Sequence, residues 1–225
     1  MYINDPFSPI PSLIAPAPWR LTGHGHIFLF WYRKEWLQEH SFLAPFQRNN
    51  VKLVLGGVIL VDYHTSDVGP YRELMFIPGL FKLGGRYLFS ISKIYVSSYD
   101  SLWNGVENWG IPKELADFSL ETAGKGQETW TVNRGDKEIF SVRLKSKGWS
   151  LPISTTLFPL RIGQELRGQL LITEPNVSGT CQRTTSDSWR TDPAFFPPVN
   201  QLRPWLGLSI HDFNMKFPEP VKTAI

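Results

Sequence analysis

The sequence predicts a mainly β (α+β) protein, in which a single domain forms a closed antiparallel barrel or strongly curved sheet with a few short helices. Aromatic residues make up 14% of the 225 residues, and such side chains favour strands and apolar cavities. Many short apolar or alternating runs are separated by turn residues, and few segments have helical periodicity. No internal repeat or linker divides the chain, so residues 1–225 are expected to form one domain.

The composition is that of an ordinary globular protein and excludes several function classes. Hydrophobic residues make up 42% and charged residues 19% of the chain. The net charge is +3 and the basic residues are scattered, so nucleic acid is not an expected partner. A single cysteine, Cys181, excludes an intrachain disulfide framework and a thiolate metal cluster. No apolar run reaches the roughly 20 residues of a membrane span, and the N-terminus lacks the basic start of a signal peptide, so the expected location is the cytoplasm.

The N-terminal region is predicted to hold an arm, a strand and a helix. Residues 1–18 form a Pro-rich arm that is expected to be extended, because proline at this density excludes helices and central strands. A buried strand is predicted over residues 26–33 and a helix over residues 33–40. His24 and His26 lie two residues apart in a Gly-rich turn. Since the sequence signals no third ligand nearby, they are interpreted as structural and no metal site is expected.

The remainder of the chain is predicted to be rich in strands. A short helix is expected at residues 112–116, and a polar loop rich in Ser, Thr and Pro at residues 174–200. The turn at residues 134–136 is typical of a hairpin. Strands are predicted over residues 51–63, 71–78, 86–96, 128–133, 138–145, 165–173 and 202–217.

The stretch at residues 99–118 is the segment most indicative of chemistry. It contains a single lysine, Lys113, among tryptophans, glycines and other apolar residues. A lysine buried in apolar surroundings is one way to produce a neutral, nucleophilic amine, because burial penalises the ammonium form. The alternative is that Lys113 opens a short helix after Pro112 with its ammonium in solvent, since most lysines are exposed.

An acidic residue on the strand predicted at residues 71–78 is a second candidate. Glu73 alternates with Tyr71 and Met75, which places the three side chains on one face of the strand and indicates that Glu73 faces an interior. The alternative is that Glu73 lies at the solvent-exposed rim of the sheet, where its carboxylate pairs with Arg72 or Arg86.

Two motifs resemble those of a known family. Gly105-x-Glu107, followed by Pro112-Lys113, resembles the active-site segment of acetoacetate decarboxylases. Upstream, Gly-Pro-Tyr-Arg-Glu-Leu at residues 69–74 resembles the family's strand that contributes an active-site glutamate, and the order and spacing of the two motifs fit. The resemblance extends over most of residues 15–217, and its specificity rests on the residues around these motifs.

This resemblance implies roles for particular residues. Lys113 corresponds to the Schiff-base lysine, Glu73 to the polar group that faces the substrate, and Glu107 to a residue that helps to shape the same cavity. Tyr71 and Trp109 are expected to contact the substrate. The resemblance also implies an antiparallel β-barrel or cone that assembles into homo-oligomers, and a reaction that needs no cofactor.

The sequence departs from the family's pattern at three points. Glu114 follows Lys113 where the decarboxylases have a second lysine, and it would counteract activation of the amine unless its side chain points away. The arginine expected to contact the substrate carboxylate is missing from the first strand region, where Gly25 and its histidine neighbours stand and Arg20 and Arg33 are imperfectly placed. A second interior carboxylate is replaced by an apolar residue near Ile59.

We therefore expect a Schiff-base-forming lyase that acts on a β-keto acid or a related carbonyl compound. Decarboxylation, aldol and dehydratase chemistry all pass through the same iminium–enamine pair, so Lys113 and Glu73 would serve each of them. Trp103, Trp109 and Phe118 are expected to pack the cavity wall. The alternative is a non-catalytic barrel that binds an apolar small molecule, with Lys113 as a polar group in its pocket.

Overall fold

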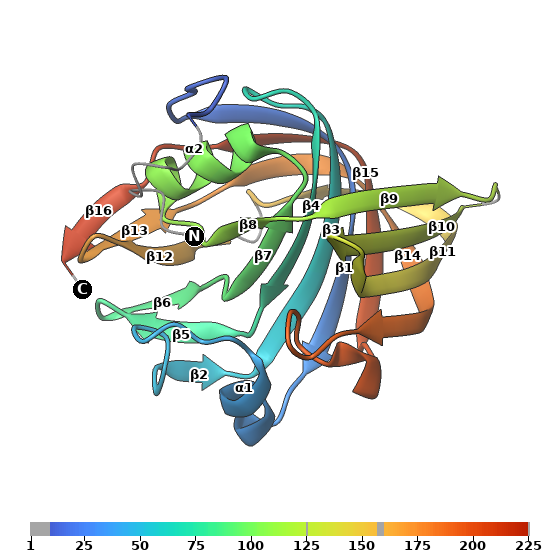
Figure 1. Ribbon diagram of the computed structural model, residues 1–225, viewed down its shortest axis with the longest axis horizontal. Helices are drawn as coiled ribbons and strands as arrows, with labels where there is room; N and C mark the ends of the chain where they lie inside the picture. Colours follow the sequence, from blue (N-terminus) through green and yellow to red (C-terminus); the bar gives the residue numbers. More distant parts are fainter. Residues whose placement is uncertain (1–9, 125, 157–159, 225) are drawn as a thin grey trace.

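The computed structural model describes residues 10–124, 126–156 and 160–224, and strands dominate them (Figure 1). The helices are α1 (Lys34–His40), α2 (Tyr99–Trp109) and a 3-10 turn, η1 (Val199–Gln201). The strands are β1 (Trp19–Trp31), β2 (Val51–Leu53), β3 (Leu55–Thr65), β4 (Tyr71–Ile77), β5 (Leu80–Leu83), β6 (Arg86–Phe89), β7 (Lys93–Val96), β8 (Lys113–Leu115), β9 (Asp117–Thr122), β10 (Gln127–Arg134), β11 (Lys137–Ser154), β12 (Ile162–Leu166), β13 (Gln169–Thr173), β14 (Asn176–Thr191), β15 (Leu206–Phe217) and β16 (Val221–Ala224).

The strands form two sheets, and the larger one is almost closed. Its ten strands run in the order β8-β7-β4-β3-β1-β15-β14-β11-β10-β9, and the second sheet has the order β16-β13-β12-β6-β5-β2. Strands β8 and β9 occupy opposite edges of the larger sheet, yet only Ala116 separates them in the chain. The sheet must therefore curl until its edges approach each other, and the ribbon follows this curl (Figure 1). The predicted mainly β, strongly curved architecture is confirmed.

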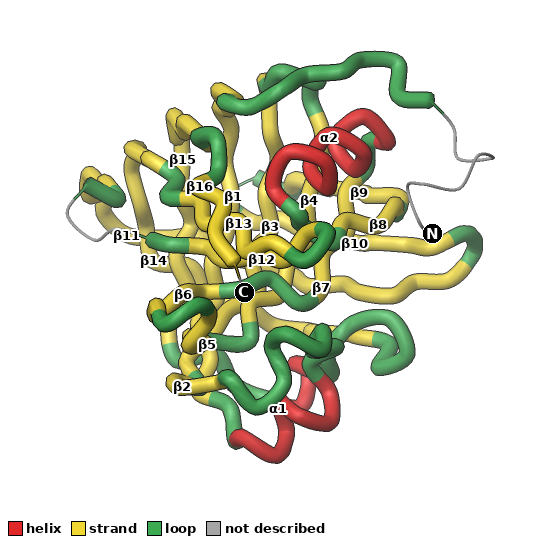
Figure 2. The backbone as a smooth tube through the Cα atoms, turned by 90° about the vertical axis from the view of Figure 1, so that its left-hand side faces the viewer, coloured by secondary structure: helices red, strands yellow, loops and turns green. Residues whose placement is uncertain are grey.

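The central strands of the curled sheet are buried on both faces. On the inner face, Phe28 and Leu60 pack with Trp130 and Phe140 from the opposite side of the curl. On the outer face, residues such as Val61 pack against a second apolar cluster that includes α2 and β12. Central strands buried on two faces have continuous apolar runs, as the sequence has. Figure 2 shows α1 and α2 at opposite ends of the molecule.

Helix α2 differs from the sequence-based prediction. The helix lies before Pro112 rather than after it, and the residues predicted to be helical, 112–116, contain strand β8, which pairs in parallel with β7. The helix begins after Ser98, whose side chain accepts a hydrogen bond from the Ser101 amide. It ends at Gly110, whose left-handed backbone (φ 67°) is the conformation that glycine adopts readily.

Other segments were also predicted incorrectly. Residues 51–63 and 86–96 were each expected to be one strand, and each is divided between two strands that belong to different sheets. Residues 176–191, expected to belong to a polar loop, form the long strand β14, which pairs with β11 on one side and β15 on the other. Residues 165–173, expected to be one strand, contain the turn of the β12–β13 hairpin at Arg167 and Gly168, both with positive φ.

The described part of the N-terminal arm lies along α2 of its own chain. The Ser12 amide donates to Asp100 Oδ1 at 2.7 Å, and the Ala15 amide donates to Asn104 Oδ1 at 2.8 Å. Asn104 Nδ2 in turn donates to the Leu13 carbonyl at 2.7 Å. The first half of the predicted arm, residues 1–9, lies outside the described residues. None of the described helices is long and apolar enough to cross a bilayer.

Candidate active site

A cavity of about 180 Å³ lies against the outer face of the ten-stranded sheet. Its walls come from β1, β3, β4, β7, β8, β12, β14 and β15, and from the end of α2. Apart from a few polar groups, the described lining is made of aliphatic and aromatic side chains: Trp19, Leu21, Ile27, Ile59, Val61, Met75, Ile77, Ile91, Ile94, Trp109, Ile111, Leu160, Ile162, Val177, Ile210, Phe213, Met215 and Phe217.

Lys113 lies in the wall of this cavity, at the start of β8. The residue is only 8% exposed, so the interpretation of Lys113 as a solvent-exposed helix residue is wrong. Its Nζ lies 3.1 Å from Glu73 Oε2 and donates a hydrogen bond to Ser101 Oγ at 2.9 Å. The same nitrogen stands 5.0 Å from the centre of the Tyr71 ring. The amine is thus held at a fixed point by groups from β4 and α2.

Helix α2 provides the space for the lysine side chain. A Cβ atom added at Gly105 would lie 2.7 Å from both Cδ and Cε of Lys113, so only glycine leaves room for the methylene chain. Ser101 lies one helical turn before Gly105, which puts both residues on the same face of α2. No sequence pattern marked Ser101 as a site residue. The i, i+4 spacing of Ser101 and Gly105 becomes a signal only when α2 is placed correctly.

Glu73 projects from β4 into the cavity, as its alternation with Tyr71 and Met75 predicted. All three residues line the cavity, and Glu73 is 3% exposed. The alternative of a rim carboxylate paired to Arg72 is wrong, because Arg72 pairs with Asp62 at 3.2 Å. Burial without an opposite charge would be costly for a carboxylate, and the Lys113 ammonium supplies that charge.

Two tyrosines complete the polar part of the wall. Tyr63, which no sequence pattern marked as a site residue, donates from its hydroxyl to Glu73 Oε1 at 3.5 Å, and its ring centre lies 4.6 Å from that of Tyr71. Burial raises the pKa of Tyr63 and of Tyr71 well above the usual value of 10.0, and the negative charge of Glu73 adds to the effect. Both phenols therefore stay protonated and available as hydrogen-bond donors at neutral pH.

Glu114 points away from Lys113. Its carboxylate accepts a hydrogen bond from Arg134 Nη1 at 2.8 Å and is also paired with Lys93 Nζ. Adjacent residues of a strand project to opposite faces, so Glu114 faces away from the cavity that Lys113 lines. The acidic neighbour is therefore neutralised by two cations and separated from the amine by the sheet.

Of the other residues predicted to line the cavity, the structure places Trp109 in the described lining but not Glu107, Trp103 or Phe118. Trp109 lines the cavity, where its Nε1 donates to the Pro218 carbonyl at 2.7 Å. Glu107 is not among the described lining residues, and its carboxylate pairs with Arg167 Nη2 at 2.6 Å. Trp103 is also absent from the described lining, and Phe118 packs against the core on the inner face of the curl. The predictions that Trp103 and Phe118 pack the cavity wall were therefore wrong.

The cavity contains no arginine among its described lining residues. Gly25 and Ile59 both line it, so the positions where the resemblance implies an arginine and a second carboxylate are occupied by groups without charge. Among the lining residues that the structure describes, Glu73 and Lys113 are the acidic and basic groups, and His26 also belongs to this lining.

Comparison with solved structures places this architecture among acetoacetate decarboxylase-like folds. Acetoacetate decarboxylase from Legionella pneumophila superposes with a TM-score of 0.74 at 15% identity, over 99% of this chain and 93% of that one. An acetoacetate decarboxylase-like enzyme from Sphingomonas wittichii gives 0.68 at 11% identity, over 97% and 98%. The enduracididine biosynthesis enzyme MppR, complexed with the condensation product of pyruvate and imidazole 4-carboxaldehyde, gives 0.66 at 12% identity, over 94% and 91%.

The sequence itself identifies the family. Residues 43–191 match the acetoacetate decarboxylase (ADC) family, and this match covers well over half of the chain. The protein therefore belongs to the acetoacetate decarboxylase family, as the motifs around Glu73 and Lys113 suggested. Comparison with curated proteins gives no match. Family membership supports an enzymatic activity of the decarboxylase type or a related one.

Proposed function

We propose that this protein is a carbon–carbon lyase that forms a Schiff base between Lys113 and an apolar carbonyl compound. The observation that carries the proposal is the position of Lys113 Nζ, buried in the wall of an apolar cavity and 3.1 Å from Glu73 Oε2. Imine formation needs a nucleophilic amine and a group that takes up and returns its proton. Lys113 and Glu73 fill these two roles within contact distance of each other.

The reaction follows from this pair. Glu73 takes a proton from the Lys113 ammonium, and the neutral nitrogen attacks the carbonyl carbon. Loss of water leaves an iminium, which accepts the electron pair of the carbon–carbon bond that breaks as CO2 or an aldehyde departs. Glu73 returns its first proton to the departing water and is a carboxylate again when the carbon–carbon bond breaks. In aldol-type cleavage it then takes the proton of the substrate β-hydroxyl group as the aldehyde departs, and in decarboxylation it takes a proton from water. The resulting enamine receives this proton on carbon from Glu73. Water then hydrolyses the new iminium, which releases the product and restores the amine.

The lining favours a substrate that is mainly apolar. A substrate carboxylate would meet no arginine among the described lining residues, and it would be repelled by Glu73. Aliphatic and aromatic walls instead favour a hydrocarbon chain or ring, because burial of apolar surface stabilises binding by about 25 cal/mol per Å². An apolar cavity of about 150 Å³ accommodates benzene, so a cavity of about 180 Å³ suits an acyl group of similar size.

Relatives support carbonyl chemistry in this fold. The MppR structure contains a condensation product of two carbonyl compounds, pyruvate and an aldehyde. Aldol-type cleavage or condensation therefore stands beside decarboxylation as a reaction for Lys113. The absence of an arginine from the described lining favours the aldol-type reaction, because that substrate needs no carboxylate.

The alternative is a binding protein without activity. The apolar lining suits a lipid fragment or a similar ligand, and Lys113 Nζ already has Glu73 and Ser101 as partners. The two functions differ in one property, the covalent reaction of Lys113 with carbonyl compounds.

Product analysis tests the proposal. The protein is incubated with apolar β-hydroxy ketones and apolar β-keto acids, with acetoacetate as the polar comparison, and the carbonyl products and CO2 are quantified. We expect cleavage of an apolar substrate at a higher kcat/KM than that of acetoacetate. Glu73→Gln should lower kcat by at least about 100-fold, the contribution typical of a general acid–base group.

A variant that removes the Lys113 amine must also remove the charge of Glu73. Lys113→Met alone would leave the buried Glu73 carboxylate unpaired, at a cost of about 3–5 kcal/mol. The double variant Lys113→Met/Glu73→Gln avoids this and should be folded and inactive, whereas Lys82→Met, at an exposed position on β5, should retain activity. Cleavage that persists in the folded double variant would contradict the proposal.

A further inference from the structure

A second cluster of polar side chains lies on the face of the sheet opposite the cavity. Strand β3 lines the cavity with Ile59, Val61 and Tyr63, so Asp62 between them projects from the other face. Asp62 pairs across the strands with His24 of β1. A β-bulge between Thr22 and Gly23 shifts the register beside His64, and bulges commonly redirect side chains.

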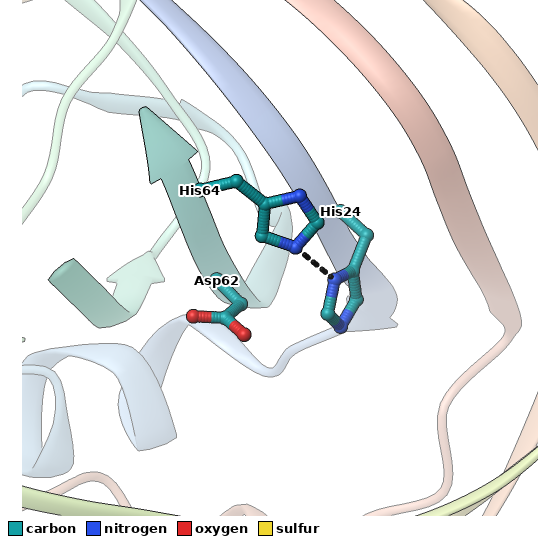
Figure 3. A group of neighbouring side chains, drawn as sticks. All are labelled: His24, Asp62 and His64. Carbon is teal, nitrogen blue, oxygen red and sulfur yellow. Dashed lines mark hydrogen bonds between the residues drawn. The ribbon is translucent and has the colours of Figure 1, made fainter. Parts of the chain in front are cut away.

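The cluster brings three potential metal ligands together (Figure 3). His24 Nδ1 and His64 Nε2 face each other at 3.2 Å, and one ligand atom from each of His24, Asp62 and His64 lies within 4.8 Å of the other two. In a tetrahedral zinc site with bonds of about 2.0–2.1 Å, two ligand atoms are about 3.4 Å apart. Arg72 Nε binds Asp62 Oδ1 at 3.2 Å, which leaves Oδ2 for an ion.

The opposite nitrogen of His24 faces a carboxylate. His24 Nε2 lies 3.7 Å from Glu128 Oε2, and this nitrogen is buried without a hydrogen-bond partner. Glu128 is held in place by His26 Nε2 and Trp130 Nε1, each at 2.9 Å from Oε2. Histidines that bind metals usually direct their second nitrogen to a carboxylate, which fixes the ring and makes it more basic. Glu128 occupies that position.

We propose that His24 Nδ1, His64 Nε2 and the Asp62 carboxylate bind a divalent transition-metal ion such as Zn²⁺. Two imidazoles and one carboxylate match the preferences of this class of ion, and the exposed His64 leaves the site open to water as a further ligand. The ion would link β1 to β3 through its ligands. Because His24 also faces Glu128 of β10, the ion would connect both strands to the other side of the curl. The site is separate from Lys113, and the ion stabilises the curled sheet rather than taking part in the reaction at Lys113.

Thermal unfolding of the metal-free protein with added Zn²⁺ tests this site. An ion that binds the folded state raises Tm in proportion to the logarithm of its free concentration once the site is saturated. We expect this rise in the parent and in His40→Gln, a control at the histidine of α1. The rise should be lost in His64→Gln and Asp62→Asn, and Mg²⁺, which prefers oxygen ligands, should produce none. No rise in the parent, or an equal rise in His64→Gln, would overturn the proposal.

Cobalt provides a second measurement that does not depend on stability. Co²⁺ bound by two histidines and a carboxylate has a visible absorption band, which should saturate at one ion per chain. The band should be present in His40→Gln and absent in His64→Gln. Because the cluster lies across the sheet from the cavity, reaction of Lys113 with carbonyls should be unchanged in His64→Gln. A saturating band of equal intensity in His64→Gln would exclude these ligands.

Discussion

At the scale of single residues, the candidate site depends on how closely the Lys113 side chain is confined. Glu73 and Ser101 hold its nitrogen at 3.1 and 2.9 Å, and a side chain at Gly105 would crowd its methylene groups from the side of α2. A nitrogen with a fixed position loses little freedom when it attacks a carbonyl carbon, and such positioning contributes substantially to catalysis.

Gly105→Ala tests this confinement. The new methyl group would lie 2.7 Å from Lys113 Cδ and Cε, so the flexible lysine chain must move while the helix backbone stays in place. We expect the free energy of unfolding to change by less than about 1 kcal/mol, because alanine favours helix over glycine by about that amount and offsets the local crowding. The yield of trapped imine should fall at least tenfold.

A neighbouring substitution on the same helix provides the control. Val106→Ala shortens a part-buried side chain that does not line the described cavity wall, and it should leave imine formation unchanged. Equal imine yields for Gly105→Ala and the parent would show that the position of the amine is not limiting.

Sequence reasoning at this scale found residues that carry a chemical signature. Lys113 and Glu73 became candidates through an isolated lysine and through strand alternation, and the resemblance to acetoacetate decarboxylases gave them their expected roles. The structure brings the two residues together. Ser101 and Tyr63 were missed because a serine and a tyrosine have no distinctive spacing until α2 and β3 are placed in space. The orientation of Glu114 was also undetermined, since its partners Lys93 and Arg134 lie about 20 residues away in the sequence, on either side of it.

At the scale of elements, α2 connects the arm to the active site. Asn104 is 1% exposed, accepts a hydrogen bond from the Ala15 amide and donates to the carbonyls of Leu13 and Asp100. Three residues earlier on the same helix, Ser101 binds Lys113. Contacts of the arm therefore fix the helix that positions the amine.

Asn104→Ala should loosen this connection. The substitution leaves the Ala15 amide and the Leu13 carbonyl without their partner, and a buried unpaired polar group costs about 1–3 kcal/mol. We expect the free energy of unfolding in urea to decrease by about 2 kcal/mol. Asn108→Ala removes one part-buried hydrogen bond, to the Ala15 carbonyl, and should have a smaller effect. Equal losses in the two variants would contradict the account of Asn104.

The errors in predicting elements have physical causes. Residues 99–109 contain Asn104, Gly105 and Asn108, which have low helix propensity, whereas Pro112 followed by Lys-Glu-Leu-Ala is typical of a helix start. Pairing with β7 overrides that local preference and makes β8 a strand. Strand β14 is rich in Ser and Thr because few of its side chains are fully buried, and this composition is typical of a loop.

At the scale of the whole molecule, the curl of the larger sheet was predictable and the arrangement of its edges was not. Many short strands without a covering set of helices indicate a closed or curved sheet. The order of the strands depends on contacts between residues far apart in sequence, such as β1 with β15. The cavity on the outer face and the cluster at His24 both arise from such contacts, which explains why the sequence signalled no third ligand for the histidines.

The buried tyrosines predict how the stability of the molecule depends on pH. Burial raises the pKa of Tyr63 and Tyr71 in the folded protein, so both phenols stay protonated where those of the unfolded chain ionise, near pH 10. Their contribution to stability is complete below about pH 10 and is lost as pH rises toward the folded-state pKa values. The free energy of unfolding should therefore decrease above about pH 10.

A phenylalanine variant isolates this effect. The free energy of unfolding in urea is measured at a series of alkaline pH values for the parent and for Tyr63→Phe/Tyr71→Phe. It should decrease less steeply with pH in the variant, because the variant lacks these two phenols. Some decrease should remain, because other buried tyrosines are present in both proteins. Identical slopes would show that Tyr63 and Tyr71 are not responsible.

The central claim is that Lys113 forms a Schiff base, and borohydride trapping tests it most directly. The protein is treated with apolar aldehydes and ketones, with acetoacetate and with pyruvate, then reduced, digested and mapped by mass spectrometry, beside Lys113→Met/Glu73→Gln and Lys82→Met. We expect a reduced adduct on the peptide that contains Lys113, most abundant with an apolar carbonyl, present in Lys82→Met and absent from the double variant. A folded parent protein that forms no adduct at Lys113 with any of these carbonyls would contradict the claim and favour a binding protein with the decarboxylase fold.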